Sequence, residues 1–139
     1  MKELLLDVNT ALRHLLQDDQ KQGPFATKLF ADAGRGLCRL KIDALAVAEC
    51  VYVLYGEYQR DRKQIAFALD QLIQSAGVEA AQLGILRDAL RRFSETRVDF
   101  QDAWLAAKSN ETKNDVVSFD RDFDKFADVA RFEPGRDSF

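Results

Sequence analysis

Short apolar runs alternate along this chain with longer segments that have helical periodicity. The two clearest runs, at 4–6 and 116–119, have the length and composition of strands that are buried in a parallel sheet. Strands that alternate with helices form a parallel sheet with helices on both faces, because the chain crosses back over the sheet before each new strand. The sequence therefore predicts an α/β fold with a mainly parallel central sheet.

Two further strands are expected, at 37–42 and 129–132, whereas no clear strand can be assigned to 78–83. Asn9 is the expected cap of the first helix. The other expected helices are 25–33, 44–55, 61–75, 82–93, 99–108 and the short 120–126. A chain of 139 residues has the size of one domain, so residues 1–139 are predicted to form a single domain.

The chain has 20 Lys and Arg residues against 23 Asp and Glu residues, and its net charge is −3. A protein that coats nucleic acid is strongly basic, so any contact with nucleic acid should be local here. The two cysteines, Cys38 and Cys50, are too few for a disulfide scaffold and are expected to be buried thiols in a reducing compartment. No apolar stretch approaches the roughly 20 residues of a membrane span or resembles a signal peptide. A soluble cytoplasmic protein is therefore expected.

An aspartate follows each of the two clearest strands. Asp7 comes after 4–6, and Asp120 comes after 116–119. In a parallel α/β sheet, ligands bind outside the carboxyl ends of the strands, so both carboxylates should emerge at one edge of the sheet. The alternative is that each Asp only caps the next helix, which is a common use of Asp at this position.

Glu49 is the only charged residue of the predicted helix 44–55. That helix is apolar on every side, so it is expected to lie buried at the centre of the fold. A buried carboxylate without a partner is costly, and Glu49 should therefore meet a cation. A metal ion meets this need most simply, and an Arg from a distant part of the chain is the alternative. Tyr52 and Tyr55 on the same helix are expected in the core or in a dimer interface.

Asp99 suits the N-cap of the predicted helix 99–108, and Asp102 lies in its first turn beside small residues that allow a close approach to a sheet. Asp102 is therefore expected at the same edge as Asp7 and Asp120. Carboxylates that gather in one cleft repel each other unless a divalent ion lies among them. All-oxygen ligands favour Mg²⁺ or Mn²⁺, and a chain with one His and no CxxC spacing lacks the usual zinc ligands.

These motifs follow one another along nearly the whole chain. They are Leu6-Asp7-Val8-Asn9, Glu49 within an apolar helix, Asp99-Phe100-Gln101-Asp102-Ala103 and Ser118-Phe119-Asp120-Arg121-Asp122-Phe123. The chain thereby resembles PIN-domain proteins, specifically the VapC-type toxins of bacterial toxin–antitoxin pairs. The resemblance implies a three-layer α/β/α sandwich and Mg²⁺-dependent endoribonuclease activity. It also implies a homodimer and a small antitoxin that holds the enzyme inactive.

Carried over position by position, the resemblance implies a catalytic and metal-binding set. Its members are Asp7, Glu49, Asp102 and Asp120. The polar neighbours that would support them are Asn9, Ser118, Asp122 and Asp99. The implied reaction is metal-assisted hydrolysis of RNA phosphodiesters, which leaves 5′-phosphate and 3′-hydroxyl ends. The candidates to grip RNA are Arg13, Arg39 and Arg121, for which ordinary solvated surface charge is the alternative.

Two other functions stay open. A PIN-like module that binds RNA or a protein without cutting has no use for four carboxylates, because negative charge does not help to bind phosphate. A phosphatase with an aspartyl nucleophile after its first strand often carries a second Asp two positions later, where this chain has Asn9. Such a phosphatase would also leave Glu49 without a role. Both alternatives are weaker than the nuclease interpretation.

Overall fold

The computed structural model describes all 139 residues of the chain. They form two compact units, Met1–Leu83 and Gly84–Phe139. The first unit contains a three-stranded sheet, and the second contains a separate pair of strands. None of the helices combines the length and the apolar composition that a membrane span requires.

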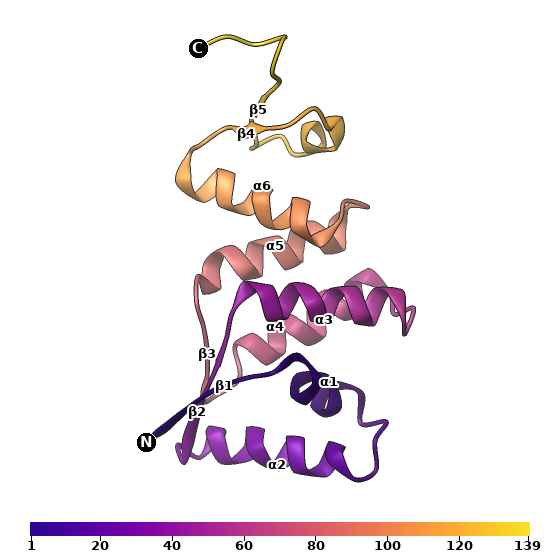
Figure 1. Cartoon of the computed structure of the whole chain (residues 1–139), viewed down its shortest axis with the longest axis vertical. Helices are drawn as coiled ribbons and strands as arrows, with labels where there is room; N and C mark the ends of the chain where they lie inside the picture. Colours follow the sequence, from indigo (N-terminus) through magenta and orange to yellow (C-terminus); the bar gives the residue numbers. More distant parts are fainter. The chain divides into compact units, whose positions relative to one another are not determined.

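The sheet of the first unit is parallel, as predicted. Its strands are β1 (Lys2–Leu5), β2 (Cys38–Ile42) and β3 (Val78–Ala80), in the order β1-β2-β3. β3 forms in the stretch where the sequence shows no clear strand. Its side chains are exposed or half-buried, so it lacks the apolar run that marks the other strands. Helices α1 to α4 of this unit lie to one side of the strands (Figure 1).

The two faces of this sheet differ, because successive side chains of a strand point to opposite sides. Leu40 and Ile42 of β2 are buried against the helices. On the opposite face, Lys41 Nζ lies 3.3 Å from Glu3 and 3.6 Å from Glu79. Exposed ion pairs of this kind contribute about 0–1 kcal/mol each, so this ladder of charges fixes register more than stability.

The helices of the first unit begin close to where the sequence places them. They are α1 (Val8–Leu16), α2 (Gln22–Gly34), α3 (Ala44–Gly56) and α4 (Arg62–Ile73). The expected cap Asn9 is wrong, because α1 begins one residue before it. Asp7 is the N-cap instead, and its carboxylate accepts a hydrogen bond from the backbone N–H of Asn9 at 3.1 Å.

Helix α3 is not buried on all sides. Its residues Val47 and Cys50 are fully buried, whereas Leu45 is 82% exposed and Tyr52 is 72% exposed. Glu49 is also exposed, so the prediction that burial forces it to find a partner is wrong. The reason is that α3 packs along one side against α1 and α4, and its composition is apolar on more faces than this packing uses.

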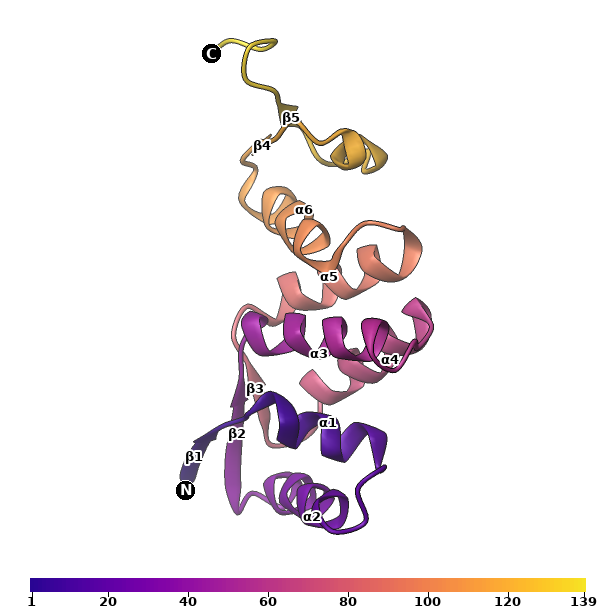
Figure 2. The same ribbon diagram turned by 45° about the vertical axis from the view of Figure 1, so that its right-hand side comes forward.

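The second unit has two long helices and a strand pair (Figure 2). The helices are α5 (Leu83–Glu95) and α6 (Phe100–Thr112), and Asp99 is the N-cap residue of α6, as predicted. The rings of Phe93 and Phe100 meet edge to face at 6.2 Å. The parallel strands β4 (Val116–Val117) and β5 (Arg131–Phe132) flank the short 3-10 helix η1 (Arg121–Lys125). These strands are shorter than the runs 116–119 and 129–132 that predict them.

Candidate active site

Asp7 lies at the junction between β1 and α1, which the sequence marks as a change from a short apolar run to a helix. Its side chain is exposed, and one carboxylate oxygen caps α1 through the N–H of Asn9. Capping uses one lone pair of one oxygen, so the rest of the carboxylate stays available to a ligand. The helix-cap alternative and the ligand interpretation are therefore compatible at this residue. Asn9 interacts with Asp7 through its backbone N–H, which donates to the Asp7 carboxylate.

The charges of Glu49 and Asp7 both act on the thiol of Cys50, which belongs to the first unit. Burial raises the pKa of the Cys50 thiol to about 12, and the negative charges of Glu49 and then Asp7 add to the rise. Cys50 is completely buried and is a free cysteine. The middle of α3 and the start of α1 therefore contribute one acid each to the same neighbourhood.

In the second unit, the charges of three other aspartates act on Asp102 in the first turn of α6. The pKa of Asp102 is raised, first by partial burial and then by the charges of Asp120, Asp99 and Asp122. No cation is among these causes, so the carboxylate of Asp102 is surrounded by like charge. Such crowding disfavours the ionised form of a carboxylate and favours the binding of a cation.

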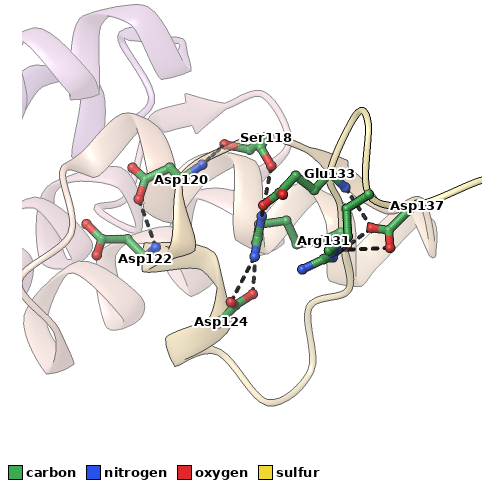
Figure 3. A network of polar contacts seen from close by, with 8 residues as sticks. Ser118, Asp120, Asp122, Asp124, Arg131, Glu133 and Asp137 are labelled. Carbon is green, nitrogen blue, oxygen red and sulfur yellow. Dashed lines mark hydrogen bonds and ion pairs between the residues drawn. The ribbon is translucent and has the colours of Figure 1, made fainter.

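The turn between β4 and η1 presents Asp120 (Figure 3). The backbone N–H of Asp120 donates to Ser118 Oγ at 2.9 Å, and its carboxylate accepts from the N–H of Asp122 at 2.8 Å. Ser118 thus supports the position of Asp120, and Asp120 also caps η1. Asp122 forms an ion pair with Lys125 at 3.3 Å. Asp120 is exposed and has no such partner, which leaves it free for a ligand.

Ion pairs divide the acids of this protein into two groups. Most acids near a Lys or Arg are paired with it, including Asp19, Asp32, Asp88, Asp124, Asp128, Glu133 and Asp137. None of the four predicted ligands forms an ion pair. Asp99 shares this state, so freedom from ion pairs alone does not identify a ligand. The four are singled out by the motifs of the sequence, and their freedom from ion pairs is what a metal ligand requires.

The donor set fits a hard divalent cation. The side chains of the four predicted ligands are all carboxylates, which are ligands that Mg²⁺ and Mn²⁺ prefer. The structure contains no group of three or more His, Cys, Asp or Glu side chains that is arranged to hold a metal ion. Each unit supplies two of the four expected ligands: Asp7 and Glu49 in the first, Asp102 and Asp120 in the second.

The three arginines expected to grip RNA differ in their surroundings. Arg13 lines an open groove of about 710 Å³ between α1 and α2, together with Asn9 and Phe25, and its Nε donates to Gln22 at 2.9 Å. Arg39 lies near the start of β2 and pairs with Glu79 at 3.3 Å, on the charged face of the sheet. Arg121 is exposed at the start of η1, next to Asp120. Arg13 and Arg121 are therefore better placed near the acids than Arg39.

Arg131, which no motif of the sequence singles out, packs against the turn that carries Asp120. Its side chain is only 3% exposed, and it contacts the carbonyl of Ser118 at 3.1 Å. The only signal in the sequence is the high density of acids around it, at Asp122, Asp124 and Glu133.

The family model of the PIN domain matches residues 4–129, a range that contains all four predicted ligands. A comparison with curated proteins found no match. The family match and the parallel sheet β1-β2-β3 confirm the predicted α/β/α fold class. PIN domains are typically Mg²⁺-dependent nucleases, so the match supports metal-dependent cleavage of nucleic acid.

Proposed function

Because this chain belongs to the PIN domain family, we propose that it is a metal-dependent endoribonuclease with Asp7, Glu49, Asp102 and Asp120 as its ligands. One observation carries the proposal: none of the four acids forms an ion pair with a Lys or Arg, and the carboxylate of Asp102 is crowded by the charges of Asp120, Asp99 and Asp122. Carboxylates crowded without a cation cost stability, and a bound divalent ion would relieve that cost.

Within this proposal the carboxylates hold and orient the ion, while the protein keeps them ionised and correctly placed. When bound, a Mg²⁺ or Mn²⁺ ion would polarise a phosphate oxygen and lower the pKa of a bound water. One of the four carboxylates would accept the proton of that water. Asp7 and Asp120 are fixed by their capping hydrogen bonds, which makes them suitable for positioning.

RNA is the proposed substrate. With a net charge of −3, the chain offers no broad basic surface, so phosphate must be held by a few cations close to the acids. Arg13 and Arg121 meet this requirement, since each lies within a few residues of a proposed ligand. Arg39 is the weakest of the three candidates because it pairs with Glu79 at 3.3 Å, whereas Arg13 is paired more loosely, at 3.8 Å, with Asp18 and Asp19.

A role as the toxin of a toxin–antitoxin pair is the finer part of the proposal. It rests on the order of the four motifs, from Leu6-Asp7-Val8-Asn9 to Ser118-Phe119-Asp120, which resembles VapC-type toxins. A small antitoxin that carries a basic side chain would supply the cation that the acids lack. A homodimer and a cytoplasmic location belong to the same proposal, and two buried free thiols suit a reducing compartment.

The test is cleavage of total RNA by the purified protein, with the new ends mapped by sequencing. The wild type with Mg²⁺ or Mn²⁺ should make discrete cuts that leave 5′-phosphate ends, and chelation with EDTA should stop them. Glu49→Gln should abolish cutting. Glu57→Gln, a matched change of an exposed acid at the end of the same helix, should cut normally.

Three results would count against the proposal. Equal cutting by wild type and Glu49→Gln would show that the site lies elsewhere. Cutting that survives EDTA would remove the metal from the mechanism. Tight binding of RNA without any cut, under either ion, would favour the alternative of a non-cleaving module.

A further inference from the structure

Arg131 is the most completely enclosed cation of the second unit together with Arg92, since both side chains are 3% exposed. Burying a guanidinium is costly unless its donors are satisfied. The Nε and Nη2 atoms of Arg131 donate to the two oxygens of Asp124 at 3.0 and 3.1 Å. Nη1 donates to Glu133 at 2.6 Å and to the backbone carbonyl of Ser118 at 3.1 Å.

These contacts grip both ends of one short segment (Figure 3). Ser118 is its first residue and Asp124 belongs to η1 at its far end. Asp120 and Asp122 lie between the two gripped points. Ser118 passes the restraint on, because its hydroxyl accepts from the N–H of Asp120 and its N–H donates to the carbonyl of Phe132 at 3.1 Å.

We infer that Arg131 is a positioning residue: it braces the segment 118–124 so that Asp120 stays in the geometry in which it binds the metal ion. The inference rests on the proposed function, since it gives Asp120 the role of a ligand. Arg131 itself touches neither Asp120 nor Asp102. Asp124 and Glu133 engage its donors, and its charge therefore does not neutralise the ligands that it helps to place.

The fork geometry of Arg is what the brace requires. A guanidinium holds both oxygens of Asp124 in one plane and still reaches the Ser118 carbonyl, whereas a Lys ammonium acts as a single point charge. Arg131→Lys keeps the charge and loses the fork. Groups that orient metal ligands typically affect metal affinity by about 10- to 100-fold, so a Mn²⁺ dissociation constant about tenfold higher is expected.

The chain contains a matched control in Arg92. Its Nη1 and Nη2 donate to the two oxygens of Asp128 at 2.8 and 2.5 Å, and its Nε donates to Asp88 at 2.9 Å. Arg92 thus has the same burial and the same fork on a carboxylate, but its partners belong to α5 and to the turn before β5. Arg92→Lys should cost similar stability and leave Mn²⁺ affinity unchanged.

The experiment combines Mn²⁺ titration with amide hydrogen exchange measured by NMR. Arg131→Lys should weaken Mn²⁺ binding about tenfold and speed exchange of the Asp120 and Asp122 amides, whose acceptors lie in the braced segment. Asp124→Asn, a change at a half-exposed position, should do the same to a smaller degree. If Arg131→Lys does not fold, Asp124→Asn decides the question by the same two readouts.

Unchanged Mn²⁺ affinity and unchanged amide exchange in a folded Arg131→Lys protein would overturn the inference. An equal loss of Mn²⁺ affinity in Arg92→Lys would also overturn it, because the effect would then be general destabilisation. A wild type that neither binds Mn²⁺ nor cuts RNA would refute the proposed function instead. The brace would then be judged on the two exchange rates alone.

Discussion

Gly77 tests how closely the start of β3 packs against the end of α2 in the first unit. It connects α4 to β3 with φ at +84°, and its carbonyl accepts from the N–H of Leu40 in β2 at 2.8 Å. A Cβ at Gly77 would lie 2.8 Å from the Cβ of Ala33, and nearer still to the carbonyl of Ala33 at the end of α2. Gly77→Ala therefore forces backbone to move.

The cost has two parts that a second glycine can separate. The left-handed backbone costs a residue with a Cβ about 1–2 kcal/mol. The overlap with the end of α2 adds about 1–3 kcal/mol, the usual cost of overpacking. Gly36 has nearly the same backbone, with φ at +81°, and a Cβ there would meet nothing within 4 Å. Gly36→Ala should therefore show the first cost alone.

Urea denaturation followed by circular dichroism measures both changes as free energies of unfolding. Gly77→Ala should lose about 2–5 kcal/mol, and Gly36→Ala should lose about 1–2 kcal/mol. Equal losses for the two variants would refute the reasoning, since the close approach of Gly77 to Ala33 would then carry no energy.

The remaining predictions concern titration. Partial burial lowers the pKa of His14, the only histidine, whose Nδ1 lies 3.0 Å from Thr27 Oγ1. Because the pKa is lower in the folded state, the free energy of unfolding should fall as pH drops below the unfolded value of 6.5. NMR titration of the ring should give a pKa below 6.5. The pKa of Asp102 is raised, so its ionised form lowers the free energy of unfolding at neutral pH. This destabilisation decreases as pH falls and the carboxylate is protonated. Asp102→Asn should therefore increase the free energy of unfolding at pH 7 while it abolishes metal-dependent cutting, and a less stable variant would contradict the crowding of charge around Asp102.

The parallel pairing of β1 and the place of Asp7 between a strand and a helix could be predicted because they depend on local pattern. The predicted common sheet edge for Asp7 and Asp120 could not, because β1 and β4 belong to different sheets. The run 4–6 is apolar over its whole length, as a strand of a parallel sheet usually is, and Asp7 follows it directly. Aspartate also caps helices well, so one residue carries the signal for both the end of a strand and the start of a helix. Asp120 repeats this arrangement before η1.

The features that could not be predicted depend on which neighbours an element meets. The composition of α3 shows that it is apolar, but not that it packs on one side, so the exposure of Glu49 was missed. β3 was missed because its sequence, Val78-Glu79-Ala80, is too short and too polar to show a period. Arg131 looks like a surface residue in the sequence, since its acid partners become visible only when the turn is folded.

The distribution of cations in the second unit explains how it can keep a crowded group of acids. Arg92 forms an ion pair with Asp128, and Arg131 forms ion pairs with Asp124 and Glu133. Had Arg131 reached Asp120 instead, the ion pair would have stabilised the fold and lowered the affinity of that carboxylate for a metal ion. The acids that shape the turn thus receive the buried cations. Asp102 and Asp120 receive none, and Asp122 pairs only with the half-exposed Lys125. A divalent ion from solution is the partner that such a division leaves room for.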